Sequence, residues 1–270
     1  MAGKHRRSEV ALRQSHRLMT SSSQAPSTGM RLVRRVTVDC LWGAVSQYED
    51  QTYAAALDGI YRVTSHCQSS LVIPVNGMVW NISVNEGVIY TLVNTNINGW
   101  SVRVYGPNYE LIRSWRPNED SEDSEDCEDI YQFVVRKETV LVAHRGSKTI
   151  IQNSLTGEVK KRIPCPILSN MAIHNTWLCV MPSRHDAVIM SCNGTVYCID
   201  VSTGHCLWST SSLEKPTAVC CDDADRVYVA VCGEADTIQI AILDGDTGKS
   251  VFPSQTHPCF SYCSTFVSFN

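Results

Sequence analysis

A unit of four short apolar segments recurs five times between residues 41 and 254, and this repeat constrains the fold more than any other feature. The clearest copy spans residues 79–116 and reads VWNISV, VIYTLVN, SVRVYG and LIRSWR. The other copies span residues 42–75, 130–164, 177–211 and 216–254. Alternation of apolar and polar residues is typical of β-strands, and a repeat of this length predicts a radial or stacked β architecture.

A glycine-containing turn precedes the fourth segment in three of the copies. Gly157, Gly204 and Gly248 occupy this turn and lie 47 and 44 residues apart. Glycine supplies the positive φ that a tight hairpin needs, so its recurrence at one phase has a mechanical cause. We expect each of these turns to join the third and fourth strands of a unit.

The repeat predicts an all-β fold, a β-propeller of four-stranded blades. It leaves no window of 10–15 residues for an amphipathic helix, which argues against a parallel α/β fold. Residues 32–38 and 260–269 each read as one further strand. We therefore expect five full blades plus an incomplete or terminally completed sixth. Either the chain is a shortened or alternative product of a six-bladed protein, which we favour, or five blades close and the end strands supplement the last interface.

Charge divides the chain into a basic tail and an acidic body. Residues 1–35 carry a net charge of +7 and the remainder −11. We expect residues 1–30 to be a disordered tail, with a nuclear-import patch or an organelle transit peptide as alternatives. Residues 31–270 are expected to form the propeller.

Two charged segments of the body are candidate binding sites. Residues 118–129 read NEDSEDSEDCED, which cannot form a strand and predicts an acidic loop on one rim. Its candidate binding residues are Glu119, Asp120, Glu122, Asp123, Glu125 and Asp126. The basic cluster of the body consists of Lys148, Lys160, Lys161 and Arg162.

The thirteen cysteines indicate buried free thiols more than disulfides or metal ligands. Several lie inside apolar strands, and no C-x-x-C spacing occurs. Free thiols are typical of a reducing compartment, so we expect a cytoplasmic protein, with the nucleus or mitochondria as alternatives. We expect no metal and no cofactor. We also expect no membrane span, because no apolar run approaches about 18 residues.

The repeat unit resembles the six-bladed propellers of the NHL class, especially the C-terminal propellers of TRIM-type proteins. The resemblance rests on GVIYTLVN with SVRVYGPNYELIRSW, on GEVKKRIPCP, and on RVYVAVC with IAILDGDTGKSVF. The segment TVYCIDVSTGHCLWST is also similar to quinoprotein-type repeats. The NHL resemblance implies a substrate adaptor or scaffold, and sometimes an RNA reader. No RING finger, B-box or coiled coil precedes the repeats, so ubiquitin-ligase activity is not expected.

The sequence favours a non-catalytic interaction module that binds protein partners, some of them basic, through rim loops. No residue pattern resembles a nucleophile beside a base. An RNA-binding propeller is one alternative, and a metal-dependent hydrolase of the lactonase type is another. An incomplete blade would expose a sheet edge, so self-association is a further possibility.

Overall fold

The structure is a computed structural model that describes residues 45–48, 51–64, 68–95, 99–117, 130–144, 147–170, 177–184, 186–192, 194–213, 216–232 and 237–258. All of these residues belong to the compact unit Arg34–Asn270. The predicted tail, the predicted end strands at 32–38 and 260–269, and the acidic segment 118–129 lie outside the described residues.

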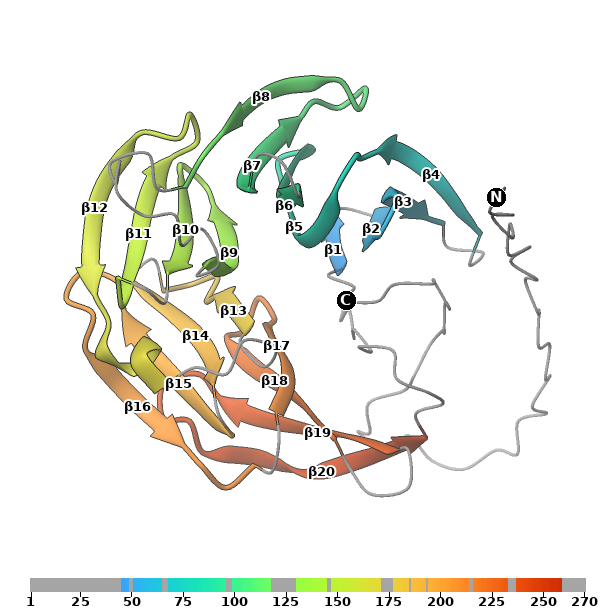
Figure 1. Ribbon diagram of the computed structural model, residues 1–270. Coiled ribbons are helices and arrows are strands. Elements are labelled where there is room, and N and C mark those ends of the chain that lie inside the picture. Colours follow the sequence, from blue (N-terminus) through green and yellow to red (C-terminus); the bar gives the residue numbers. More distant parts are fainter. Residues whose placement is uncertain are drawn as a thin grey trace, which may run out of the picture. The chain divides into compact units, whose positions relative to one another are not determined.

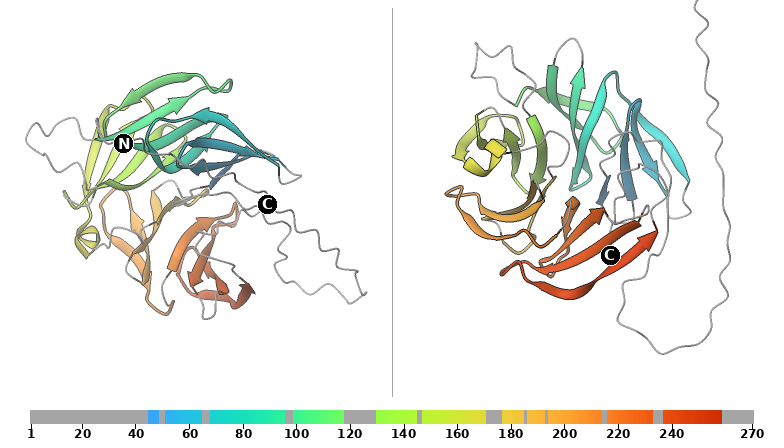
Figure 2. Two further views of the ribbon diagram at one scale, coloured as in Figure 1. Left: turned by 45° about the vertical axis from the view of Figure 1, so that its right-hand side comes forward. Right: turned by 60° about the horizontal axis from the view of Figure 1, so that its bottom comes forward.

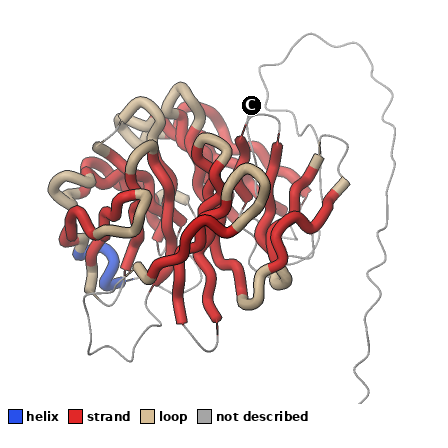
Figure 3. The backbone as a smooth tube through the Cα atoms, turned by 90° about the horizontal axis from the view of Figure 1, so that it is seen from above, coloured by secondary structure: helices blue, strands red, loops and turns tan. Residues whose placement is uncertain are grey.

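Five four-stranded antiparallel sheets form the described fold, and each pairs its strands in their order along the chain (Figure 1). We call these sheets blades 1 to 5. Blade 1 contains β1 Val45–Tyr48, β2 Gln51–Ala56, β3 Gly59–Val63 and β4 Ser69–Pro74; blade 2 contains β5 Met78–Asn85, β6 Val88–Thr95, β7 Gly99–Tyr105 and β8 Leu111–Trp115; blade 3 contains β9 Ile130–Arg136, β10 Thr139–His144, β11 Thr149–Ser154 and β12 Val159–Pro164; blade 4 contains β13 Trp177–Val180, β14 Ala187–Cys192, β15 Thr195–Asp200 and β16 Cys206–Thr210; blade 5 contains β17 Pro216–Cys221, β18 Arg226–Cys232, β19 Thr237–Asp244 and β20 Ser250–Pro258. A short 3-10 helix, η2 Pro166–Asn170, follows β12 (Figure 3).

The first strand of each blade lies beside the first strand of the next. Strand β1 contacts β5, β5 contacts β9, β9 contacts β13, and β13 contacts β17. The blades follow one another around a common axis, with these strands innermost and the fourth strands outermost (Figures 1 and 2). The predicted β-propeller of five full blades is therefore confirmed, whereas the sixth blade stays a prediction.

Apolar side chains fill the interfaces between successive blades. Each of four buried clusters combines residues of two neighbouring blades. Each interface contains fully buried residues of both blades, such as Ile60 and Ile89 for blades 1 and 2, Leu92 and Phe133 for blades 2 and 3, Ile150 and Met190 for blades 3 and 4, and Val196 and Val229 for blades 4 and 5. Burying one such side chain contributes about 1.5–3 kcal/mol, so the blades stabilise one another.

The second strands of the blades are buried along several consecutive residues. In β10 and β18 a run of consecutive residues is buried, rather than every second residue. Strand β10 lies between blade 2 on one face and blade 4 on the other, so both of its faces exclude water. The apolar run VLVAH meets this requirement.

The fourth strand of every blade is irregularly paired. The ladder between the third and fourth strands contains a register shift in all five blades. The ladder between the second and third strands is regular throughout. Bulges increase local twist and make an edge a poor template for another strand, so these shifts protect the outer rim.

Two tryptophans of outer strands pack on the glycine turns of the following blade. Trp115 of β8 lies against Gly157, whose φ is +96°, and a Cβ at Gly157 would come within 2.5 Å of the indole. Trp208 of β16 lies against Gly248, whose φ is +67°, and a Cβ there would come within 2.4 Å of the indole. Trp208 Nε1 also donates a hydrogen bond of 2.7 Å to Gly245 O. The recurring glycine thus serves both the turn and the contact between blades.

We predict that Gly248→Ala destabilises the protein more than Gly194→Ala does. Both glycines have positive φ, but a Cβ at Gly194 meets nothing within 4 Å, whereas at Gly248 it meets Trp208. The strained φ costs about 1–2 kcal/mol at each site, and displacement of Trp208 adds about 1–3 kcal/mol at Gly248 alone. Urea unfolding of the two variants measures the difference, and equal losses would contradict the tryptophan contact.

Candidate functional site

The turns at one end of blades 3 to 5 form the candidate site. In a four-stranded antiparallel sheet, the turn between strands one and two and the turn between strands three and four lie at the same end. We define the turn face as residues 137–138, 154–158, 181–184, 186, 200–205, 222–226 and 244–249. The strands place these segments, and the segments carry hydrogen bonds and ion pairs between blades.

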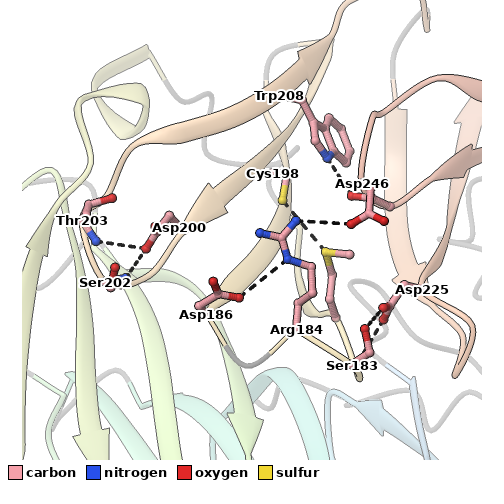
Figure 4. A network of polar contacts seen from close by, with 12 residues as sticks. Ser183, Arg184, Asp186, Cys198, Asp200, Ser202, Thr203, Trp208, Asp225 and Asp246 are labelled. Atoms are coloured by element: carbon pink, nitrogen blue, oxygen red, sulfur yellow. Dashed lines mark hydrogen bonds and ion pairs between the residues drawn. The ribbon is translucent and has the colours of Figure 1, made fainter.

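Arg184 contacts residues of three blades, and Figure 4 shows its contacts with Asp186 and Asp246. Its Nε lies 3.6 Å from Asp186 Oδ1, and its Nη1 lies 3.4 Å from Asp246 Oδ1 in blade 5. Its backbone oxygen accepts a bond of 3.4 Å from Arg136 Nη2 at the end of β9 in blade 3. Burial lowers the pKa of Arg136, and the nearby Asp186 carboxylate opposes this shift. Arg184 therefore holds residues of blades 3, 4 and 5 together.

Further hydrogen bonds join the turns of successive blades. Asn85 Nδ2 of blade 2 donates to Lys137 O of blade 3 at 3.1 Å. Ser183 of blade 4 donates its backbone N–H to Asp225 Oδ1 of blade 5 at 3.1 Å, and its hydroxyl donates to Asp225 Oδ2. Together with Arg136 and Arg184, these contacts form a continuous series from blade 2 to blade 5.

Aspartates fix the backbone of two glycine turns. Asp200 Oδ1 accepts from the backbone N–H groups of Ser202 and Thr203, at 2.6 and 3.1 Å. Asp244 Oδ1 accepts from the backbone N–H and the hydroxyl of Thr247, at 2.9 and 2.7 Å. Hydrogen bonds from Ser202 and from Thr247 lower the pKa values of these two carboxyls. The turns are therefore ordered by charge-assisted bonds.

Asp222 fixes the first turn of blade 5 in the same manner. Its Oδ1 accepts from the backbone N–H groups of Ala224 and Arg226, at 3.0 and 2.9 Å. Its Oδ2 lies 2.6 Å from Arg226 Nη2 and accepts from the Tyr228 hydroxyl at 3.0 Å. Partial burial alone would raise the pKa of Asp222, but the bonds from Arg226 and Tyr228 outweigh it, so the pKa is lowered.

Acidic residues outnumber basic ones on the turn face. The acids are Glu138, Glu158, Asp186, Asp200, Asp222, Asp223, Asp225, Asp244 and Asp246, and the bases are Lys137, Arg184, Arg226 and Lys249. Asp186, Asp223 and Asp246 are exposed. This surface thus presents negative charge on a framework of fixed turns.

The predicted basic cluster is divided in the structure. Lys160, Lys161 and Arg162 lie on β12, and Lys148 lies in the turn between β10 and β11, at the end of blade 3 away from the turn face. Lys161 Nζ donates to Ser202 O of blade 4 at 2.5 Å. The structure therefore joins Lys161 to the turn face, whereas Lys148 lies at the other end of blade 3.

The acidic candidates in segment 118–129 lie outside the described residues, so their role stays a prediction. The Arg184 network was missed in the sequence, because Arg184 lies 62 residues from Asp246 and 48 residues from Arg136. The aspartates that fix the glycine turns do have a sequence signal. An aspartate stands three residues before threonine in Asp200-x-x-Thr203-Gly204 and in Asp244-x-x-Thr247-Gly248.

Within the described ranges, no group of three or more His, Cys, Asp or Glu side chains could hold a metal ion. The described part of the chain also has no helix with the length and hydropathy of a transmembrane span.

Comparison with known proteins identifies the fold and not a family. No family model matches the chain, and no curated protein is similar to it in sequence. The WD40 β-propeller domain of Doa1 superposes with a TM-score of 0.54 at 17% identity, over 80% of this chain and 67% of that chain. A chain of the mitotic checkpoint complex gives 0.55 at 7% identity, over 91% and 90%. A chain of a nidogen/laminin complex gives 0.57 at 10% identity, over 80% and 79%. The fold is shared, and the resemblance to NHL propellers stays a prediction.

We predict that the interaction between Asp222 and Arg226 is lost in acid. A carboxyl whose folded-state pKa is lowered stabilises the fold above its unfolded pKa of about 3.9, and this contribution is lost as pH falls through the folded pKa. A double-mutant cycle with Asp222→Asn and Arg226→Met should show a coupling of about 0.5–1 kcal/mol at pH 6 and a smaller coupling at pH 3. Urea unfolding at the two pH values measures it, and a coupling independent of pH would exclude the ionic contact.

Proposed function

We propose that this chain is a non-catalytic protein-interaction module that binds basic protein segments through the turn face of blades 3 to 5. The observation that carries this proposal is the Arg184 network, which connects turns of three blades. A surface held in place before binding loses little conformational entropy when a partner docks.

The charge of the turn face indicates the chemistry of the partner. Asp223 and Asp246 are exposed on neighbouring turns of blade 5, and acids outnumber bases across the surface. A partner rich in lysine and arginine complements this potential, which accelerates association and makes it sensitive to salt.

The fold agrees with a role as a binding platform. Two of the propellers that superpose on this chain come from structures of complexes, the mitotic checkpoint complex and the nidogen/laminin complex. The sequence resemblance to NHL-type propellers of TRIM proteins points to a similar adaptor or scaffold role. We propose a cytoplasmic location, with the nucleus as the alternative, because the cysteines that the structure describes carry free thiols.

The first experiment tests the surface by charge reversal. We expect Asp223→Lys and Asp246→Lys each to weaken binding of a fluorescent lysine- and arginine-rich peptide by about threefold to tenfold at low salt, since each reverses one exposed charge at the site. The matched control is Asp58→Lys, in the turn between β2 and β3, which lies at the opposite end of its blade. Fluorescence anisotropy measures the affinities.

A second experiment tests the module with natural partners. Affinity capture compares the wild-type protein, the two turn-face variants, the Asp58 control, and a variant with the acids of segment 118–129 neutralised. Proteins that are lost only with the turn-face variants support the proposal. Equal binding by all variants would refute the turn face as the contact surface. Loss of partners only in the variant with neutralised acids would assign binding to segment 118–129. Salt-dependent RNA binding that is lost in Lys160→Glu would instead favour the RNA-binding alternative.

A further inference from the structure

The inner strands of blades 4 and 5 bring two cysteine thiols into direct contact. Cys179 Sγ of β13 lies 3.3 Å from Cys221 Sγ of β17. Both residues are half-buried. The other described cysteines differ: Cys165 and Cys198 are buried within apolar clusters, and exposed Cys206 directs its thiol to Trp208 O at 3.1 Å.

The two cysteines occupy adjacent positions on the first strands of neighbouring blades, β13 of blade 4 and β17 of blade 5. Cys179 and Cys221 are 42 residues apart, and so are Ser183 and Asp225, which are hydrogen bonded at the turns that follow the same two strands. Because both contacts join residues 42 positions apart, β13 and β17 pack in a defined register. The thiols therefore face each other because of the interface between blades 4 and 5.

We propose that Cys179 and Cys221 are an oxidative modification site, at which hydrogen peroxide converts the two thiols into a disulfide that joins blade 4 to blade 5. The sulfurs need to approach by about 1.2 Å to reach disulfide bonding distance. This inference is independent of the proposed binding function.

The reaction balances with the peroxide as the oxidant. The thiolate of one cysteine attacks a peroxide oxygen, the O–O bond breaks, and a sulfenic acid and one water form after protonation. The second thiol attacks the sulfenic sulfur, the S–O bond breaks, and a second water leaves as the S–S bond forms. The two sulfurs lose two electrons to the peroxide, and the two thiol protons end on the waters.

The surroundings of the pair make this reaction slow at neutral pH. The hydrogen bond to Cys221 and burial raise the pKa of Cys179 well above its usual value, and the neighbouring thiols Cys198 and Cys220 reinforce the shift. Because the thiolate is the attacking species, oxidation accelerates as pH rises from 7 to 9. The site thus responds to sustained oxidation and resists brief exposure.

The test uses the full chain, reduced and then treated with hydrogen peroxide. Remaining thiols are blocked with N-ethylmaleimide, and tandem mass spectrometry identifies the cross-linked peptides. We expect a Cys179–Cys221 disulfide, faster formation at pH 9 than at pH 7, and a melting temperature raised by at least about 4 °C that dithiothreitol reverses. Cys179→Ala and Cys221→Ala should abolish the rise, and Cys232→Ala, at an exposed thiol of β18, should retain it.

If a variant fails to fold, identification of the disulfide in the wild-type protein alone still tests the inference. A disulfide from Cys179 to Cys220 or Cys198 would overturn the assignment. Sulfinic acid at either cysteine without a cross-link would do the same, because the second thiol would then not reach the first.

Discussion

Packing between successive blades is the constraint on which the rest of this structure depends. Each four-stranded sheet is apolar on two faces, so no blade can bury its surface alone. The four apolar clusters each draw on two neighbouring blades, and the tryptophans of two outer strands extend this packing to the rim. The stability of one blade therefore depends on the presence of the next.

This packing leaves the turns free to carry function. The strands position the turns, while hydrogen bonds and ion pairs between turns decide how rigid the surface is. Arg184 contributes at the middle of this arrangement, since it contacts Asp186 beside it and Asp246 across the interface. Exposed pairs of this kind add little stability, so their main consequence is a defined surface. A defined acidic surface suits recognition of a basic partner.

The interface between blades 4 and 5 combines three kinds of contact. An apolar cluster fills it, Ser183 and Asp225 join its turns, and Cys179 meets Cys221 on its inner strands. Apolar contacts and hydrogen bonds can break when the two blades separate, whereas a disulfide would break only on reduction. A covalent bond here would hold together the two blades that carry most of the acidic turn face.

The sequence by itself determined the strands, their grouping into five blades and the glycine turns, because these features depend on neighbours close along the chain. Strand alternation has a period of two, and a tight turn requires glycine within a few residues. The basic cluster shows the limit of this reasoning: the sequence groups Lys148 with Lys161, yet Lys161 bonds to Ser202 on the turn face and Lys148 lies at the other end of blade 3.

Only the tertiary structure decided which turns meet. Contacts such as Arg184 with Asp246, or Cys179 with Cys221, join residues 62 and 42 positions apart. Their distance depends on blade twist and on the packing register between inner strands. Neither quantity is encoded in any local pattern, because both result from the summed packing of all side chains at an interface.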